Sequence, residues 1–216
     1  MIAVTINPLS NFFFGQYTAY SAQDIVLEIT AVFLGLASVW YAKQNKIAVY
    51  PTGMISTAIF VYLLWKWLLL GDMLINAYYF IMSAYGWFYW LQKKGGQSLH
   101  PIAQINRTET LISIGLFLSS IIGVYQVYLY FDLWTSWTAY IDTFTTALFF
   151  VGMWLMARRK IEHWIFWIIG DVISVPLYFY KGLTITSLQY IIFTFIAIYG
   201  YRAWKQDLKL RLAVQG

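Results

Sequence analysis

Two tryptophans and one carboxylate stand at helical spacing inside a long apolar stretch of the chain. Trp164 and Trp167 are three residues apart, and Asp171 follows four residues after the second ring. On an α-helix these offsets fall on one face, so two flat rings and a negative charge line the same stripe. Tryptophan faces stack on flat rings and attract cations. The spacing therefore indicates a binding face for a flat, positively charged small molecule.

The composition places this stripe in a membrane. The chain has 216 residues, of which 61% are hydrophobic and 11% are charged, whereas a soluble domain carries about 25% charged residues. A carboxylate in such an apolar segment is tolerated mainly where it faces a bundle interior or a watery cavity. Two structural interpretations compete with binding: Trp164 as an anchor at the membrane surface, and Asp171 as the partner of a buried cation. No Lys or Arg lies near the middle of a predicted span, which favours binding for Asp171.

Several classes of chemistry lack the residues they need in this chain. It contains no cysteine, and its two histidines, His100 and His163, fall in predicted polar connections. Both facts argue against a thiolate or histidine metal site. The sequence has no phosphate loop, no paired histidine and carboxylate, and no hydrolytic triad. We therefore predict no catalytic residue, metal or cofactor, and we interpret the net charge of +5 through membrane loops rather than nucleic acid.

Seven apolar segments approach the roughly 20 residues that an α-helix needs to cross a membrane. Because the backbone must satisfy its own hydrogen bonds there, these segments are predicted to be helices. The predicted spans are 24–43, 48–69, 73–91, 109–129, 136–157, 161–180 and 184–204. Residues 1–23 precede them as an extracytoplasmic or interfacial segment, and residues 205–216 follow as a cytoplasmic tail.

The first three and the last three spans resemble each other. The pattern Tyr-Gly-aromatic-x-x-Trp occurs at 85–90 and again at 199–204, and an acid stands twelve residues before a tryptophan at Glu28 and at Asp142. Parallel three-helix repeats are a transporter architecture, with substrate bound near the midplane between them. We predict a 3+1+3 arrangement of two parallel repeats, 24–91 and 136–204, joined by the linker helix 109–129.

The basic residues fall almost entirely on one side of the predicted membrane. Of the fourteen Lys and Arg residues, only Lys66 and Lys181 lie on the side of the amino end. The positive-inside rule therefore places the carboxyl end in the cytoplasm and the amino end outside. A miscounted span would scramble this split, so the split also supports seven spans.

Polar side chains in two other spans are further candidates for the site. Asn76 and Tyr79 share a face of the third span, and Gln189 lies in the comparable part of the seventh. An amide offers both donors and acceptors, which suits ribose hydroxyls or a carboxamide. Asparagine in a membrane helix can equally bond one helix to another, so both interpretations of Asn76 stay open.

These residues resemble the Pnu family of bacterial vitamin transporters. The resemblance is carried by Trp164-x-x-Trp167-x-x-x-Asp171, by Asn76-x-x-Tyr79 and by Tyr85-Gly86-Trp87, and it covers most of residues 24–205. It implies a SWEET-like fold and a homotrimer in the bacterial inner membrane. It also implies that the site is lined by the tryptophan stripe of the sixth span together with Asn76 and Tyr79 of the third.

The resemblance further implies a substrate and a mode of transport. The PnuC branch of the family carries nicotinamide riboside by facilitated diffusion, and a cytoplasmic kinase then traps the vitamin by phosphorylation. Other branches carry thiamine, riboflavin and deoxynucleosides. The pyridinium of nicotinamide riboside and the thiazolium of thiamine both suit tryptophan faces beside Asp171, so the residues favour a cationic vitamin without choosing between the two. We expect a nicotinamide riboside transporter and no enzyme. The alternatives are a thiamine transporter and a vitamin-binding subunit that does not translocate.

Overall fold

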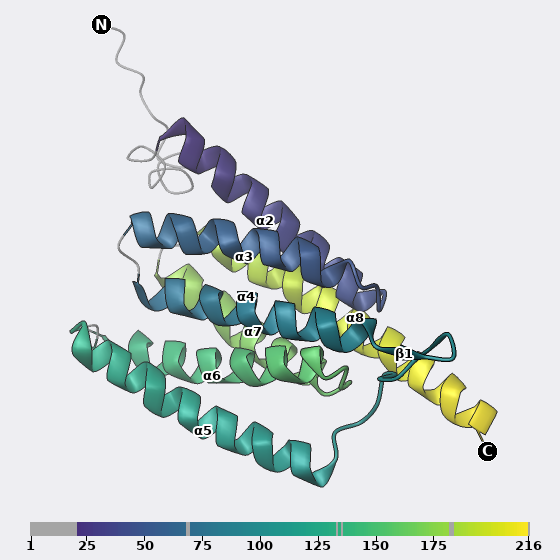
Figure 1. The fold of residues 1–216 in the computed structure, drawn as a ribbon. Coiled ribbons are helices and arrows are strands. Elements are labelled where there is room, and N and C mark those ends of the chain that lie inside the picture. Colours follow the sequence, from purple (N-terminus) through teal and green to yellow (C-terminus); the bar gives the residue numbers. More distant parts are fainter. Residues whose placement is uncertain (1–20, 68–69, 133, 135, 182–183, 216) are drawn as a thin grey trace, which may run out of the picture.

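Long helices make up almost all of the computed structural model, which describes residues 21–67, 70–132, 134, 136–181 and 184–215 (Figure 1). The helices in this part of the chain are α2 (Ala22–Lys43), α3 (Val49–Lys66), α4 (Leu70–Leu91), α5 (Arg107–Tyr130), α6 (Thr138–Ala157), α7 (His163–Tyr180) and α8 (Thr184–Gln215). Each predicted span overlaps one of these helices, which confirms the all-helical fold class. The predicted segment 1–23 lies almost wholly outside the described residues.

The end of α8 differs from the prediction. This helix does not stop at residue 204 but continues to Gln215, so the described residues of the predicted tail are helical. In Figure 1 the end of α8 extends beyond the bundle on the side of a small hairpin, which pairs β1 (Lys93–Lys94) with β2 (Gln97–Ser98) in antiparallel fashion.

The helices pack in the order of the chain. In one half of the molecule α3 lies between α2 and α4, and in the other half α7 lies between α6 and α8. The two halves meet where α2 contacts α8 and where α4 contacts α6. Helix α5 connects the halves in sequence and packs mainly against α6, along the outside of the bundle (Figure 1). The space between the halves is therefore enclosed by helices other than α5.

Several helices present apolar side chains to their surroundings. By length and composition, α2, α5, α6 and α7 are each long and apolar enough to cross a membrane, among the residues that the structure describes. On α5, Leu111, Leu118 and Ile122 are 70%, 55% and 61% exposed. Exposed leucines and isoleucines along a continuous helix are suited to contact with lipid rather than water. The fold is thus that of a multi-pass membrane protein.

The turns after α2 and α6 have the same backbone conformation. Asn45 and Arg159, which are 114 residues apart, both adopt a positive φ, of 55° and 60°. Each turn is closed by an equivalent hydrogen bond, from Lys46 N to Tyr41 O at 3.0 Å and from Lys160 N to Leu155 O at 2.9 Å. A single left-handed residue is a common way to end a helix. The same device thus ends the first helix of each half.

A ring packs on a glycine at equivalent positions of the two halves. A Cβ added at Gly86 of α4 would lie 2.5 Å from Tyr50 of α3, and one added at Gly200 of α8 would lie 2.5 Å from Trp164 of α7. Real Cβ atoms essentially never come this close to another atom, so only glycine lets the ring approach. The Tyr-Gly pattern of the sequence therefore marks the place where the third helix of each half meets the second.

The side chains of Arg159 and His100 secure the connection between α4 and α5. The guanidinium of Arg159 donates to Asn45 Oδ1 at 2.8 Å, to Ser98 Oγ at 2.8 Å and to the carbonyl of His100 at 3.0 Å. The ring of His100 stacks on Tyr89, with centroids 3.6 Å apart. Burial, followed by the nearby positive charge of Arg158, lowers the pKa of His100, so its ring is neutral when it stacks at physiological pH. The hairpin connection is thereby tied to the turns of both halves.

Candidate substrate-binding cavity

A cavity lies between the two halves and contains every residue predicted for the site. Side chains from α2, α3 and α4 line one part of it, and side chains from α6, α7 and α8 line the other. The predicted residues on its lining are Asn76, Tyr79, Trp164, Trp167, Asp171 and Gln189. The fold thus brings together residues that are more than 100 positions apart in the chain. Their role in binding stays a prediction.

Asp171 is the least compensated polar group on this lining. Asp171 is 1% exposed, and neither of its carboxylate oxygens has a hydrogen-bond partner among the described residues. The ion pairs of the described residues do not include Asp171, so the interpretation as half of a structural pair finds no support there. The phenol groups of Tyr79 and Tyr190 are near enough to interact with it electrostatically. A buried carboxylate without a partner is costly, and a ligand that brings positive charge or donors would compensate it.

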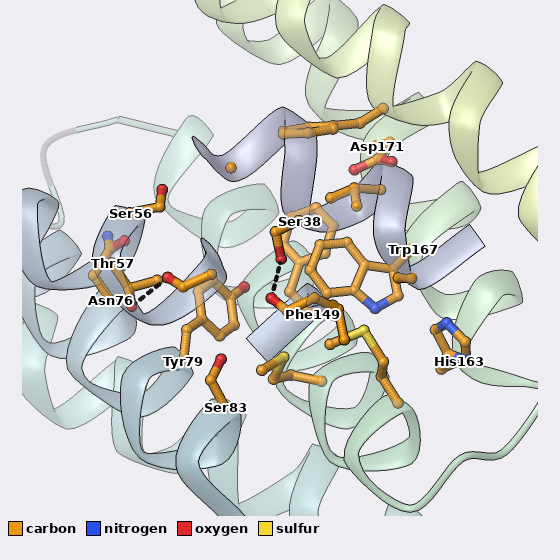
Figure 2. A pocket seen from close by; sticks show the side chains of 18 of the residues that line it. Ser38, Ser56, Thr57, Asn76, Tyr79, Ser83, Phe149, His163, Trp167 and Asp171 are labelled. Atoms are coloured by element: carbon orange, nitrogen blue, oxygen red, sulfur yellow. Dashed lines mark hydrogen bonds between the residues drawn. The ribbon is translucent and has the colours of Figure 1, made fainter. Parts of the chain in front are cut away.

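Trp167 presents a half-buried ring to the same space. Its centroid lies 5.6 Å from that of Phe149 on α6 and 6.3 Å from that of Tyr79 on α4. The indole N–H has no hydrogen-bond partner among the described residues. Figure 2 shows Trp167 beside Phe149, with Asp171 nearby. The three aromatic side chains contact one another at the centroid distances that rings favour, about 4.5–7 Å, and together they form an aromatic surface on which a flat ring can stack.

Trp164 lies on the same stripe but is packed differently. It is 2% exposed and covers Gly200 of α8. Its ring centroid lies 4.3 Å from that of His163 and 5.9 Å from that of Trp204. A ring this deeply buried is not an anchor at the membrane surface. Both tryptophans line the cavity, but Trp164 is buried against α8 and Trp167 is half-buried.

The amides of the lining are half-buried. The amide nitrogen of Asn76 donates to the carbonyl of Asp72 in the preceding turn of α4, at 2.9 Å. This bond stays within one helix, so it does not support the interpretation that Asn76 joins two helices. Figure 2 places Asn76 near Thr57 and Ser56 of α3, on the side of the pocket away from Trp167. The polar groups of α3 and α4 thus gather opposite the aromatic side chains.

Sequence reasoning missed several residues of the lining. Ser38 and Ser56 contribute hydroxyl groups, and Phe149 contributes a ring. Small hydroxyl residues are frequent wherever membrane helices touch, so their types alone do not single them out. The prediction for His163 was wrong: it is not in a polar connection but is fully buried at the start of α7, with Nδ1 2.7 Å from the carbonyl oxygen of Lys160, and it lines the cavity.

Comparison with known proteins assigns this arrangement to a family. The family model described as nicotinamide mononucleotide transporter matches residues 25–206. The chain belongs to this transporter family. The match includes every residue of the cavity lining. The resemblance to Pnu transporters, inferred from the tryptophan stripe and the residues of the third span, is confirmed.

Individual relatives agree with this membership. The chain is 28% identical over 212 residues to the nicotinamide riboside transporter PnuC of Escherichia coli strain K12, an alignment that covers 86% of this chain and 87% of the relative. It is 26% identical over 160 residues to the riboflavin/roseoflavin transporter RibM of Streptomyces davaonensis, covering 65% of this chain and 74% of the relative. The crystal structure of the vitamin B3 transporter PnuC superposes with a TM-score of 0.64 at 22% identity, covering 94% of this chain and 90% of the other. This structural likeness supports the fold.

Proposed function

We propose that this protein transports nicotinamide riboside across the bacterial inner membrane by facilitated diffusion, and that cytoplasmic phosphorylation then traps the vitamin. The observation that carries the proposal is Asp171, a buried carboxylate without a partner among the described residues, placed in a cavity beside the ring of Trp167. Family membership and the similarity to PnuC of Escherichia coli give it independent support.

The charge of nicotinamide riboside suits this site. Its pyridinium ring is flat and permanently positive, so it can stack on the aromatic side chains and at the same time offset the charge of Asp171. A desolvated cation over an aromatic face gains about 2 kcal/mol. The ribose hydroxyls carry donors and acceptors that the amides of Asn76 and Gln189 can meet. Substrate binding at this site involves Trp164, Trp167, Asp171, Asn76, Tyr79 and Gln189.

The proposed architecture consists of two parallel three-helix repeats, α2–α4 and α6–α8, joined by α5. Its support is the set of contacts that recur at an offset of 114 residues, among them the turns at Asn45 and Arg159. The amino end lies outside and the carboxyl end in the cytoplasm, as the distribution of basic residues requires. The protein assembles as a homotrimer surrounded by lipid. It leaves its substrate chemically unchanged, in keeping with a family of transporters.

Thiamine is the alternative substrate. Its thiazolium is also a flat cation, and it would offset Asp171 in the same way. The similarity to RibM, a riboflavin/roseoflavin transporter, is consistent with a fold that serves vitamins of different shape. A neutral isoalloxazine would leave the charge of Asp171 uncompensated, which disfavours riboflavin here.

Uptake into sealed vesicles tests the proposal. Purified protein is reconstituted into liposomes without ATP and without an ion gradient, and radiolabelled nicotinamide riboside is added outside. We expect saturable uptake that stops when internal and external concentrations are equal and that excess unlabelled substrate inhibits. Protein-free liposomes are the control. Binding without uptake would instead identify a vitamin-binding subunit, and uptake of thiamine alone would identify the alternative substrate.

A further inference from the structure

In each half, a glycine on one helix packs against a larger residue on the next helix. The glycine is on the second helix of the α2–α4 half but on the first helix of the α6–α8 half. Between α2 and α3, a Cβ added at Gly53 would lie 2.9 Å from the hydroxyl oxygen of Ser38. Between α6 and α7, a Cβ added at Gly152 would lie 2.8 Å from the indole nitrogen of Trp167. At the offset of 114 residues, Ser38 corresponds to Gly152 and Gly53 to Trp167. The second helix of the α6–α8 half therefore carries a tryptophan, Trp167, where the second helix of the α2–α4 half carries a glycine, Gly53.

A second pair repeats this exchange one turn further along the helices. A Cβ added at Gly35 of α2 would lie 3.2 Å from the hydroxyl oxygen of Ser56 on α3. At the equivalent positions of the other half, a Cβ added at Gly170 of α7 would overlap with the ring of Phe149 on α6. In the α6–α8 half each of these glycines therefore lies under an aromatic ring. In the α2–α4 half, the nearest atoms to Gly35 are those of Ser56, and the nearest atoms to Gly53 are those of Ser38 and Ser83.

The exchange creates part of the cavity. The rings of Trp167 and Phe149 pack against the facing glycines Gly152 and Gly170, whereas the atoms nearest to Gly35 and Gly53 belong to serine side chains. The residues that border this space are all part of the cavity lining: Gly35, Ser38, Gly53 and Ser56. Figure 2 shows Ser38 in the middle of the pocket and Ser56 on the side away from Trp167. The α6–α8 half thus supplies aromatic rings to the cavity. The α2–α4 half supplies glycines and serines at the equivalent positions, which leave space for a ring of the ligand.

The two hydroxyl groups on this wall already donate their hydrogens. Ser38 Oγ donates to the carbonyl of Val49 at 2.7 Å, and Ser56 Oγ donates to the carbonyl of Ala31 at 2.7 Å. A serine hydroxyl has one hydrogen and two lone pairs, so each oxygen can only accept from a ligand. This wall therefore favours ligand groups that donate.

We propose that the wall formed by Gly35, Ser38, Gly53 and Ser56 holds the aromatic ring of the substrate and selects a ring that bears an N–H donor over one that bears a carboxylate. The inference rests on the proposed function and adds the residues that set the size and the substituent of the ring. The primary amide of nicotinamide riboside donates hydrogen bonds. The carboxylate of nicotinic acid riboside only accepts them, and its negative charge faces that of Asp171.

A variant that fills the space tests the steric part. The double substitution Ser38→Gly with Gly53→Trp copies the arrangement of Gly152 and Trp167, so the glycine on α2 makes room for the new ring. Calorimetric titration with nicotinamide riboside should show affinity at least tenfold weaker than that of the wild type. The matched control is Gly115→Ala on α5, where a Cβ meets no atom within 4 Å, and it should bind as the wild type does. If the double variant does not fold, Ser38→Gly with Gly53→Val serves in its place, with the same direction expected.

The donor part is tested with the acid analogue. Wild-type protein should bind nicotinamide riboside at least tenfold more tightly than nicotinic acid riboside, and Ser56→Ala should lower this ratio. Equal affinity of the wild-type protein for the two ribosides would overturn the claim that the wall selects an amide over a carboxylate. A folded double variant with wild-type affinity would overturn the steric assignment while leaving the proposed function intact. Absence of any binding by the wild type would overturn the proposed function, and this inference with it.

Discussion

Trp90 and Trp204 each donate a hydrogen bond across the boundary between the two halves. The indole N–H of Trp90 on α4 reaches the carbonyl of Ala157 at 3.2 Å, and that of Trp204 on α8 reaches the carbonyl of Ala42 at 2.9 Å. Both acceptors lie in the last turn of the first helix of the opposite half. The two rings also approach each other, with centroids 5.9 Å apart. The third helix of each half is thereby fastened to the first helix of the other.

Ion pairs at the other ends of these helices join neighbours within each half. Lys66 at the end of α3 contacts Asp24 on α2 at 2.7 Å, and Lys181 after α7 contacts Asp142 on α6 at 2.5 Å. These lysines are the two basic residues that the charge count placed outside. The halves are therefore linked to each other at the predicted cytoplasmic end and braced internally at the predicted outer end.

Replacement of either crossing indole should loosen the junction between the halves. Trp90→Phe or Trp204→Phe removes one hydrogen bond, a loss of about 0.5–1.5 kcal/mol, and leaves part of a buried site unfilled. We expect a lower melting temperature in each variant by tryptophan-independent thermal assays. Trp137→Phe is the control, because Trp137 is 51% exposed. Unchanged stability in both crossing variants would show that the two bonds do not hold the halves together.

The two tryptophans of the α7 stripe should respond differently to truncation. Trp167→Ala should weaken binding of nicotinamide riboside by about 1–3 kcal/mol, the range for a base stacked on an aromatic side chain, with little loss of stability. Trp164→Ala should act mainly on stability and lower the free energy of unfolding by about 3–5 kcal/mol, as for a large buried ring. Titration and thermal unfolding of both variants separate the effects. Equal loss of binding with equal loss of stability would contradict the division of roles.

The glycines beneath the rings should tolerate no side chain. Gly86→Ala and Gly200→Ala each place a Cβ 2.5 Å from a ring, and overpacking of this kind costs about 1–3 kcal/mol. Gly123→Ala adds the same atom on α5 in open space and improves helix propensity. We expect the first two variants to melt at lower temperature and the third to melt at the wild-type temperature or above. A similar change in all three would mean that the ring contacts contribute nothing specific.

The sequence predicted the helices and the stripe well because both depend on local spacing. An apolar run of membrane length forms a helix wherever it occurs, and the offsets from Trp164 to Asp171 determine a shared face. The sequence could not show that Trp164 is buried while Trp167 is only half-buried, because the burial of Trp164 depends on Gly200, which lies on another helix. His163 was misplaced for a similar reason: its burial comes from tertiary packing with Trp204.

The polar wall of the cavity was also beyond sequence reasoning. Ser38 and Ser56 are ordinary small residues in apolar spans, and only the fold reveals that they face the aromatic side chains across a cavity. The Tyr-Gly pattern, in contrast, was visible in the sequence, and both of its glycines lie beneath a ring in the structure. Its offset later relates the serines and glycines of α2 and α3 to Phe149 and Trp167.

Selectivity for charge is the most direct test of the account. Nicotinamide riboside and its dihydro form have nearly the same shape, but only the first is a cation. Calorimetric titration of wild-type protein should show affinity for the cation at least tenfold higher, about 1.4 kcal/mol, and Asp171→Asn should abolish most of this preference while still binding the neutral form. Equal wild-type affinities for the two forms, or an unchanged preference in Asp171→Asn, would contradict the claim that Asp171 recognises a positively charged substrate.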